Sequence, residues 1–445
     1  MPEDVKDAVI GGIPRYVMYA LAFALFFTPA DYVLPAVLDH IWDIAVIACS
    51  CYCVFLVLYR QGINLQWLFF GLFFVFFYLI SGVWNQTDLP YTNIVFKLSK
   101  ALGFLSLVSY GMKKDAQSCI KGFVLAGFVM CFINFGTYLV FQDIKGGMKH
   151  GMMNWKGHLE YQRWYFFSHD NGSVFYYLPV AAAAHYYAAV YRRNFFPVAW
   201  LFTIVSLYMY IDLKSMAAIV SFGLYAAMAF LIWLYQRGGK IKRMSALSYP
   251  LMMLTGIIFN IFIIVFLNSD MLLGLLNEVF GKSSSLLERV EIWSRSIDYF
   301  AQNPILGVGP AMHDTDIARI TYEHTHNILL QVAYQGGLTS LLLLLMGCVF
   351  NYRGRVMEMG NPSVAYFTAS LVCIFVAGSF DFYYHYVPLF FPLFAYGCVG
   401  SSMDLKDGKT ERASLESDFR KWRKSISADV KHLPFIGRRL QDDRN

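Results

Sequence analysis

The sequence predicts an all-α polytopic membrane protein with about twelve transmembrane helices. Hydrophobic residues make up 57% of the 445 residues, charged residues make up only 15%, and the mean hydropathy is +0.47. A soluble domain carries more charge, about 25% of its residues, and less apolar content. Apolar runs of about 20 residues, each long enough to cross a hydrocarbon core of roughly 30 Å, recur along the whole chain.

The order of the twelve expected spans defines the topology. Their ranges are 14–30, 41–59, 63–82, 93–111, 119–141, 173–191, 195–212, 216–235, 249–268, 328–350, 364–380 and 387–403. Basic residues favour the cytoplasmic side of a membrane. With the N-terminus inside, the outer connections 31–40, 83–92 and 381–386 contain no Lys or Arg, and a further short one holds only Lys214. An even number of spans then places the C-terminal tail inside.

Two parts are therefore expected. Residues 1–403 form a transmembrane domain with long outer loops at 142–172 and 269–327, and residues 404–445 form a basic cytoplasmic tail. The tail lies on anionic membrane lipids as an amphipathic helix or is simply solvated. The net charge of +6 is explained by the inner connections and this tail, so it does not indicate a nucleic-acid partner.

The second long outer loop, before span ten, is partly helical in its pattern. Residues 284–301 place apolar side chains at spacings of four and three, namely Leu286, Val290, Trp293, Ile297 and Phe300. Arg289 lies at the edge of this stripe, whereas Arg295 lies opposite and should remain in water. Arg289 is therefore a candidate for holding an anion beneath the helix; otherwise it snorkels or pairs with a lipid phosphate.

A histidine-rich run, residues 322–327, leads from this loop into span ten. A helix N-terminus favours anionic ligands, and an imidazole takes up a proton near neutral pH. His324, His326 and Asn327 are therefore candidate site residues.

Two alternatives for this run stay open. In the first, Thr325 or Asn327 caps the helix and the histidines are merely interfacial. In the second, the His-x-His pair binds a metal together with Glu323 or Asp314, although that geometry needs extended backbone where a helix starts.

Other cations lie near the same predicted face. Arg163 in the first long loop stands among aromatic residues, a setting that suits sugars and phosphates and equally suits an interfacial aromatic belt. Lys214 occupies a short outer connection. Lys97 and Lys100 lie near the outer end of span four. They either have a functional role or extend their side chains to the membrane surface.

Four motifs together resemble the O-antigen ligase and O-antigen polymerase superfamily of bacterial envelope glycosyltransferases of the GT-C type. They are Arg289-x-x-x-Trp293, Pro304-x-x-Gly307-x-Gly309, His326-Asn327-x-x-Leu330-Gln331 and Gly336-Gly337-Leu338. The twelve spans, the cytoplasmic termini and the large periplasmic loop before span ten are also similar to that family.

The resemblance implies a metal-independent, inverting enzyme without a cofactor in the bacterial inner membrane, with its active site facing the periplasm. Its donor would be an undecaprenyl-diphosphate-linked glycan, and its acceptor a hydroxyl group. His326 matches the loop histidine of the family and would be the catalytic base, and Arg289 matches the loop arginine that binds the diphosphate. Arg163 fits a further periplasmic arginine loosely. Lys214 stands where the family usually shows a Ser-Arg pair, so it keeps the charge but lacks the bidentate fork.

Trp293, His324 and Asn327 complete the expected substrate-binding set. The leading functional prediction is an O-antigen ligase of lipopolysaccharide biosynthesis, which joins the polysaccharide to lipid A–core. One alternative is a polymerase. It would use the same donor and join repeat units, so its acceptor would be a glycan. The other is a transporter of a lipid-linked or anionic substrate, but the sequence lacks the internal repeats and the midplane polar residues typical of transporters.

Overall fold

The computed structural model describes residues 9–10, 13–29, 33–85, 91–141, 148–153, 159–164, 166–167, 172–237, 248–266, 283–309, 325–352, 364–381 and 387–402. The chain divides into two compact units, Met1–Cys398 and Val399–Asn445. Almost all described elements belong to the first unit, and the predicted tail from Asp404 lies outside the described residues.

Helices dominate the described part of the first unit, as the sequence predicts. Their bounds are α2 (Arg15–Phe26), α3 (Ala36–Leu56), α4 (Leu65–Phe74), α5 (Ser81–Trp84), α6 (Tyr91–Phe141), α7 (Val174–Val190), α8 (Phe196–Leu213), α9 (Met216–Arg237), α10 (Tyr249–Phe266), α12 (Ser283–Gln302), α14 (Ile328–Tyr352), α15 (Ala365–Gly378) and α16 (Phe391–Ser402). The π-helical segments Val57–Gln61 and Val75–Ile80 extend α3 and α4. The described strands form two antiparallel hairpins, β1 (Val9–Ile10) with β2 (Ile13–Pro14) and β3 (Met148–Met153) with β4 (Leu159–Trp164).

Six helices in the described residues are long and apolar enough to cross a membrane. They are Ala36–Gln61, Leu65–Trp84, Tyr91–Val140, Arg193–Leu213, Met216–Arg237 and Ile328–Asn351. Four shorter apolar helices of 10–17 residues accompany them: Arg15–Phe26, Tyr249–Val265, Ala365–Gly378 and Val387–Val399. The protein is thus a helical multi-pass membrane protein, and the count of twelve crossings stays a prediction.

The long helix α6 is interrupted where the sequence predicts an inner connection between two spans. Asp115 leaves the helical region, with φ −163° and ψ 85°. Its carboxylate accepts a hydrogen bond from the Ser118 amide at 3.0 Å, which caps the helical turn that follows. Arg15 of α2 lies 3.9 Å from the same carboxylate. A local capping interaction therefore accompanies the interruption.

Two helices form the centre of the first unit. Every residue of α7 from Val174 to Ala188 is buried, and so is nearly all of α15, which packs against α7, α9 and α10. A helix that is apolar on all sides is one that neighbouring helices surround, and both sequences have that character. The residues just after α15 are held at its end, because the amides of Ser379, Phe380 and Asp381 donate to carbonyls of its last turn.

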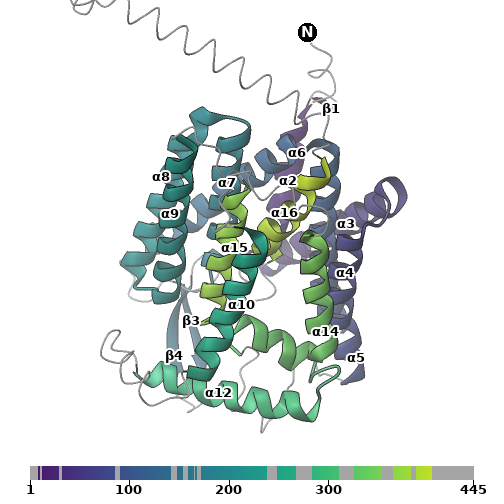
Figure 1. The fold of residues 1–445 in the computed structure, drawn as a ribbon, viewed down its shortest axis with the longest axis vertical. Coiled ribbons are helices and arrows are strands. Elements are labelled where there is room, and N and C mark those ends of the chain that lie inside the picture. The colour runs from purple at the N-terminus through teal and green to yellow at the C-terminus, as the bar shows by residue number, and fades with distance from the viewer. Residues whose placement is uncertain are drawn as a thin grey trace, which may run out of the picture. The chain divides into compact units, whose positions relative to one another are not determined.

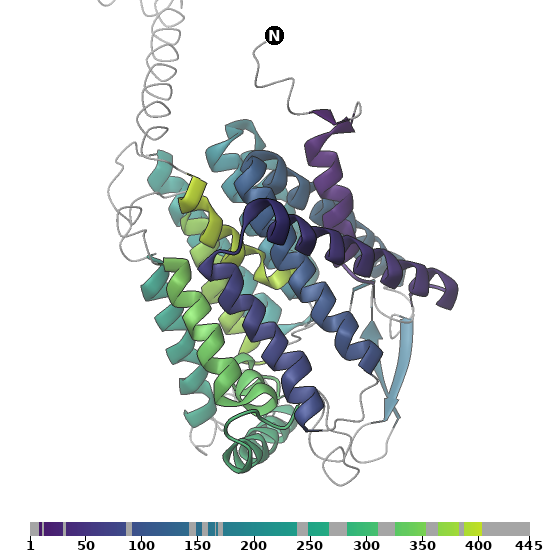
Figure 2. The ribbon, with the colours of Figure 1, turned by 90° about the vertical axis from the view of Figure 1, so that its right-hand side faces the viewer.

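The elements of functional interest gather at one end of the first unit, here called the α12 end. Figures 1 and 2 place α12 across this end, opposite the end that carries β1 and β2, with the β3–β4 hairpin in the same half of the unit but apart from α12 in Figure 2. The loop that follows α12 and the start of α14 lie there as well. The α12 end contains α12 and the described residues that follow it, 303–309, all from the second long loop that the sequence predicts to face outward.

Candidate functional site

Helix α12 presents one buried face to the bundle. Trp293 and Ile292 form an apolar cluster with Ile263 of α10 and Leu330 of α14. Ser296, one turn further on, is also buried, and its hydroxyl donates to the Ile292 carbonyl at 2.7 Å. The helix predicted for residues 284–301 is thus confirmed, and it packs against the start of α14.

The predicted apolar stripe of α12 is wrong at Ile297. That side chain is 40% exposed, while Trp293 is only 2% exposed. The buried positions follow Ile292, Trp293 and Ser296, because α10 and α14 pack on that side of the helix. Hydrophobic spacing alone favours Ile297 over Ser296, whereas the neighbouring helices determine which face is covered.

The two arginines of α12 are both partly buried, and they lie on different faces of the helix. Arg289 is partly buried and precedes Trp293 by four residues, so it lies on the face that is turned towards the bundle. The side chain of Arg295 is 38% exposed and pairs with Glu291 at 2.8 Å on the solvent side. Of the two, Arg289 is therefore the one turned towards the interior of the α12 end.

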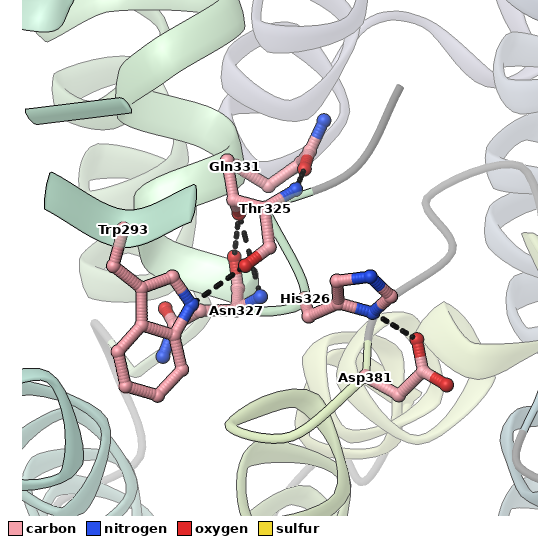
Figure 3. Close-up of polar contacts among 6 residues, drawn as sticks. All are labelled: Trp293, Thr325, His326, Asn327, Gln331 and Asp381. Atoms are coloured by element: carbon pink, nitrogen blue, oxygen red, sulfur yellow. Dashed lines mark hydrogen bonds and ion pairs between the residues drawn. The ribbon is translucent and has the colours of Figure 1, made fainter. Parts of the chain in front are cut away.

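Trp293 connects α12 to the residue that precedes His326. Its indole N–H donates to the Thr325 carbonyl at 2.7 Å. The Thr325 amide in turn donates to Oε1 of Gln331 at 2.5 Å, and the Thr325 hydroxyl donates to the Asn327 carbonyl at 3.0 Å. Figure 3 shows these bonds on one side of the backbone of His326. Trp293 and Gln331 thus hold the short segment that presents the histidine.

Asn327 is the N-cap of α14. Its Oδ1 accepts from the amides of Leu329 and Leu330, both at 3.1 Å, and the residue is fully buried. The capping interpretation of this run is confirmed for Asn327. The amides of Leu329 and Leu330, which an anion at the helix N-terminus would use, are therefore already satisfied. The Nδ2 atom of Asn327 is buried without a hydrogen-bond partner.

His326 adopts a left-handed backbone conformation, with φ 53°. Such a conformation is uncommon for a residue other than glycine and costs about 1 kcal/mol or more, so it persists where its surroundings fix it. The bonds of Thr325 and Asn327 supply that fixation on either side. In Figure 3 the imidazole consequently extends away from Trp293 and towards Asp381.

Asp381 is a site residue that the sequence analysis did not single out. Its Oδ1 lies 3.1 Å from Nδ1 of His326, and its side chain is only 4% exposed. Asp381 follows α15, and its amide donates to the Ala377 carbonyl at 3.0 Å, which fixes its position at the helix end. The sequence feature that could have indicated Asp381 is its place at the start of a predicted outer connection, 381–386, that contains no Lys or Arg. The pair arises because Ile328 packs against Gly378, bringing α14 and α15 together.

Arg163 and Lys214 belong to a different corner of the α12 end. Arg163 lies in β4, opposite Lys149 of β3 in the hairpin register. Two amides just after β4, those of Phe166 and Phe167, donate to the side chains of Thr137 and Asn134 in α6. These bonds fix the end of β4 against α6.

Lys214 follows α8 and adopts a left-handed conformation with φ 56° at the end of that helix. Two residues earlier, Asp212 accepts a hydrogen bond from the hydroxyl of Tyr138 in α6 at 2.6 Å. Phe166 and Phe167, just after β4, and Asp212, near the end of α8, are thus all bonded to one turn of α6. His324 lies outside the described residues.

A backbone interaction holds the loop after α12 against a break in α14. Gly337, with φ 66°, interrupts α14, and Figure 1 shows the helix turning sharply there. The amides of Val308 and Gly309 donate to the carbonyls of Tyr334 and Gln335 at 2.9 and 3.0 Å. In return, the amides of Leu338 and Thr339 donate to the carbonyls of Pro304 and Ile305 at 2.7 and 3.1 Å. Span ten, predicted as one continuous helix, is therefore two helical segments.

The glycine motifs of the sequence have their physical reason in this break. Gly307 and Gly337 both have φ 66°, and a Cβ atom at either position would overlap with the backbone of the other segment. Only glycine combines that backbone conformation with so close an approach. The described residues hold no group of three or more His, Cys, Asp or Glu side chains arranged for a metal ion, and the proposed metal partners Glu323 and Asp314 lie outside them.

In comparison with known proteins, a family model matches part of the chain. The family model described as O-antigen ligase matches residues 201–345, from within α8 to within α14. This segment contains Arg289, Trp293 and His326, and the match confirms the resemblance to the O-antigen ligase and polymerase superfamily. No curated protein shows a significant match to the chain.

Replacement of Gly337 with alanine tests the helix break. The Cβ would meet the Ile305 carbonyl, and alanine disfavours φ 66°, so we expect a loss of about 2 kcal/mol or more in unfolding free energy. Thermal unfolding of the detergent-solubilised protein measures it. Gly223→Ala in α9 is the matched control, because no atom lies within 4 Å of that Cβ and alanine favours a helix. Equal unfolding temperatures for the two variants would contradict the role of the break.

Proposed function

Because residues 201–345 match the O-antigen ligase family, we propose that the protein is a glycosyltransferase of the bacterial inner membrane that acts at the periplasmic face. It transfers a glycan from undecaprenyl diphosphate to a hydroxyl group of lipid A–core, and His326 is the catalytic base. The observation that supports this proposal most directly is the pair of His326 and the buried Asp381, 3.1 Å apart, on two rigidly held segments.

The pair suits proton abstraction from an acceptor hydroxyl. When Nδ1 of His326 carries the proton, it donates to Asp381, and Nε2 is the basic nitrogen of the ring. Nε2 takes the hydroxyl proton while the acceptor oxygen bonds to the anomeric carbon, and the bond from that carbon to the diphosphate breaks. The carboxylate of Asp381 orients the ring and stabilises the imidazolium that forms.

The leaving diphosphate requires positive charge, which three basic residues would supply. Arg289 is turned towards the interior of the α12 end, and its planar guanidinium matches the oxygens of a phosphate. Arg163 and Lys214, fixed through α6, would bind the second phosphate or the first sugar. Fixed cations of this kind stabilise charge that develops in the transition state.

The other candidate residues have supporting roles in this proposal. Trp293 and Asn327 hold the backbone on either side of His326, and both are buried. The partial positive charge at the start of α14 lies next to the histidine, although Asn327 occupies the amides of Leu329 and Leu330. His324 would contact the acceptor or the donor glycan.

The decisive experiment is complementation of a deletion strain with wild type or His326→Ala, followed by gel analysis of lipopolysaccharide and of carrier-linked glycan. We expect the variant to insert normally and to lose transfer by a factor of about 10² or more, since it lacks the base. Full-length polymer stranded on the carrier with bare lipid A–core identifies a ligase. Single repeat units without long polymer identify a polymerase instead. Normal profiles with His326→Ala would refute the assignment of the base.

Asp381→Asn tests the second member of the pair. The amide keeps the size of the side chain but removes the charge that stabilises an imidazolium, so we expect kcat to fall by about 10²-fold or more. Transfer from a purified lipid-linked donor to lipid A–core measures it. Asp115→Asn, at the interruption of α6, is the matched control and should retain kcat within a factor of about two. Equal rates for both variants would show that the carboxylate has no part in the reaction.

Arg289 and Arg295 form a second matched pair on one helix. Arg289→Ala removes a cation turned towards the bundle, and we expect kcat/KM for the donor to fall by about 10²-fold. Arg295→Ala removes an exposed cation whose partner is Glu291, and surface ion pairs contribute about 0–1 kcal/mol, so activity should be unchanged. Loss of activity in Arg295→Ala alone would place the diphosphate on the opposite face of α12.

A further inference from the structure

Ser81, at the start of α5, joins two segments that are far away in sequence. The residue is fully buried, and its hydroxyl lies 2.7 Å from the Leu306 carbonyl and 2.5 Å from the Gln335 carbonyl. Leu306 belongs to the loop after α12, and Gln335 belongs to the end of the first segment of α14. The Ser81 carbonyl accepts from Nδ2 of Asn85 at 2.8 Å, which closes the short helix α5.

The break at Gly337 explains why a hydroxyl is needed there. In an unbroken helix the Gln335 carbonyl would accept from the Thr339 amide, but that amide donates to Ile305 instead. The Gly309 amide replaces one bond to the Gln335 carbonyl, and the Ser81 hydroxyl adds a second. A hydroxyl has a single proton, so Ser81 shares it between Gln335 and Leu306. Loss of the hydroxyl would remove this second bond from Gln335 and the bond to Leu306, whereas the bond from Gly309 would remain.

The first segment of α14 transmits this attachment to His326. It begins after the cap Asn327 and ends at Gly336, a rigid length of about 13 Å. Ser81 and the backbone pairing fix one end of the segment, and the contact of Trp293 with Thr325 fixes the other. Because the helical segment between these two attachments is rigid, a shift at the Ser81 end strains the Trp293–Thr325 contact and tilts the start of the segment. That tilt changes the position of the histidine relative to Asp381, which follows α15.

We propose that Ser81 is a positioning residue for the transfer reaction: its bond to Gln335 sets the placement of the α14 segment that carries His326. This inference rests on the proposed function of His326. A misplacement of about 1 Å in a reacting group can lower a rate by about 10²-fold, even when the change lies away from the reacting atoms.

The test compares Ser81→Ala with Ser221→Ala. Ser221 in α9 is also fully buried, but among the described residues its hydroxyl donates only within its own helix, to Ala217 and Ala218. The two variants thus remove the same group from equally buried sites, and only one breaks a contact between elements. For Ser81→Ala we expect kcat to fall at least about tenfold with the donor KM within about twofold, whereas Ser221→Ala keeps both. Ser81→Thr, which retains the hydroxyl, should recover most of kcat.

Amide hydrogen exchange of residues 328–336 provides a readout that does not depend on activity. Faster exchange there in Ser81→Ala, absent from Ser221→Ala, supports the attachment. Faster exchange with an unchanged kcat would overturn the positioning role and leave Ser81 a structural residue. Unchanged exchange together with unchanged kcat would overturn the attachment as well. If His326→Ala retains transfer, the proposed function fails instead, and exchange alone then decides whether Ser81 holds the segment.

Discussion

The architecture of the α12 end depends on the backbone pairing between the loop after α12 and the break in α14. An interrupted helix in an apolar environment must satisfy the amides and carbonyls that its own turns no longer pair. Residues 304–309 do this with four backbone hydrogen bonds, and glycine at 307 and 337 permits the close approach. One interaction thereby fixes the end of α12, the direction of the first segment of α14 and the location of the histidine at its start.

The sequence predicts the parts of this protein that depend on local composition. Long apolar runs correspond to helices, the α12 helix lies where its periodicity indicates, and Asn327 caps α14. The break at Gly337 is not predictable from hydropathy, because residues 328–350 together still resemble one apolar span and hydropathy does not report a change in helix direction. The contact between His326 and Asp381 spans 55 residues and forms where Ile328 at the start of α14 meets Gly378 at the end of α15, which no local pattern records.

The residues around His326 fix its backbone, whereas its imidazole extends to Asp381. Trp293, Thr325, Asn327 and Gln331 each form at least one hydrogen bond with the main chain around this residue. These contacts maintain an uncommon backbone conformation at φ 53°, and the side chain of His326 extends from this framework to Asp381. A strained residue held by satisfied neighbours is typical of a site where a side chain has to be presented in one orientation. The motif residues next to the histidine therefore serve mainly to position it.

The segment that matches the family model contains only part of the proposed site. Residues 201–345 include His326 and Arg289, but Asp381, Arg163 and Ser81 all lie outside the matched segment. On the proposed mechanism, the matched segment carries the base and one cation, while the orienting carboxylate and the anchor come from α15 and α5. Features of the reaction shared with the family should then depend on α12 and α14. The fit to a particular glycan or acceptor should depend on parts of the chain outside the matched segment, such as the β3–β4 hairpin.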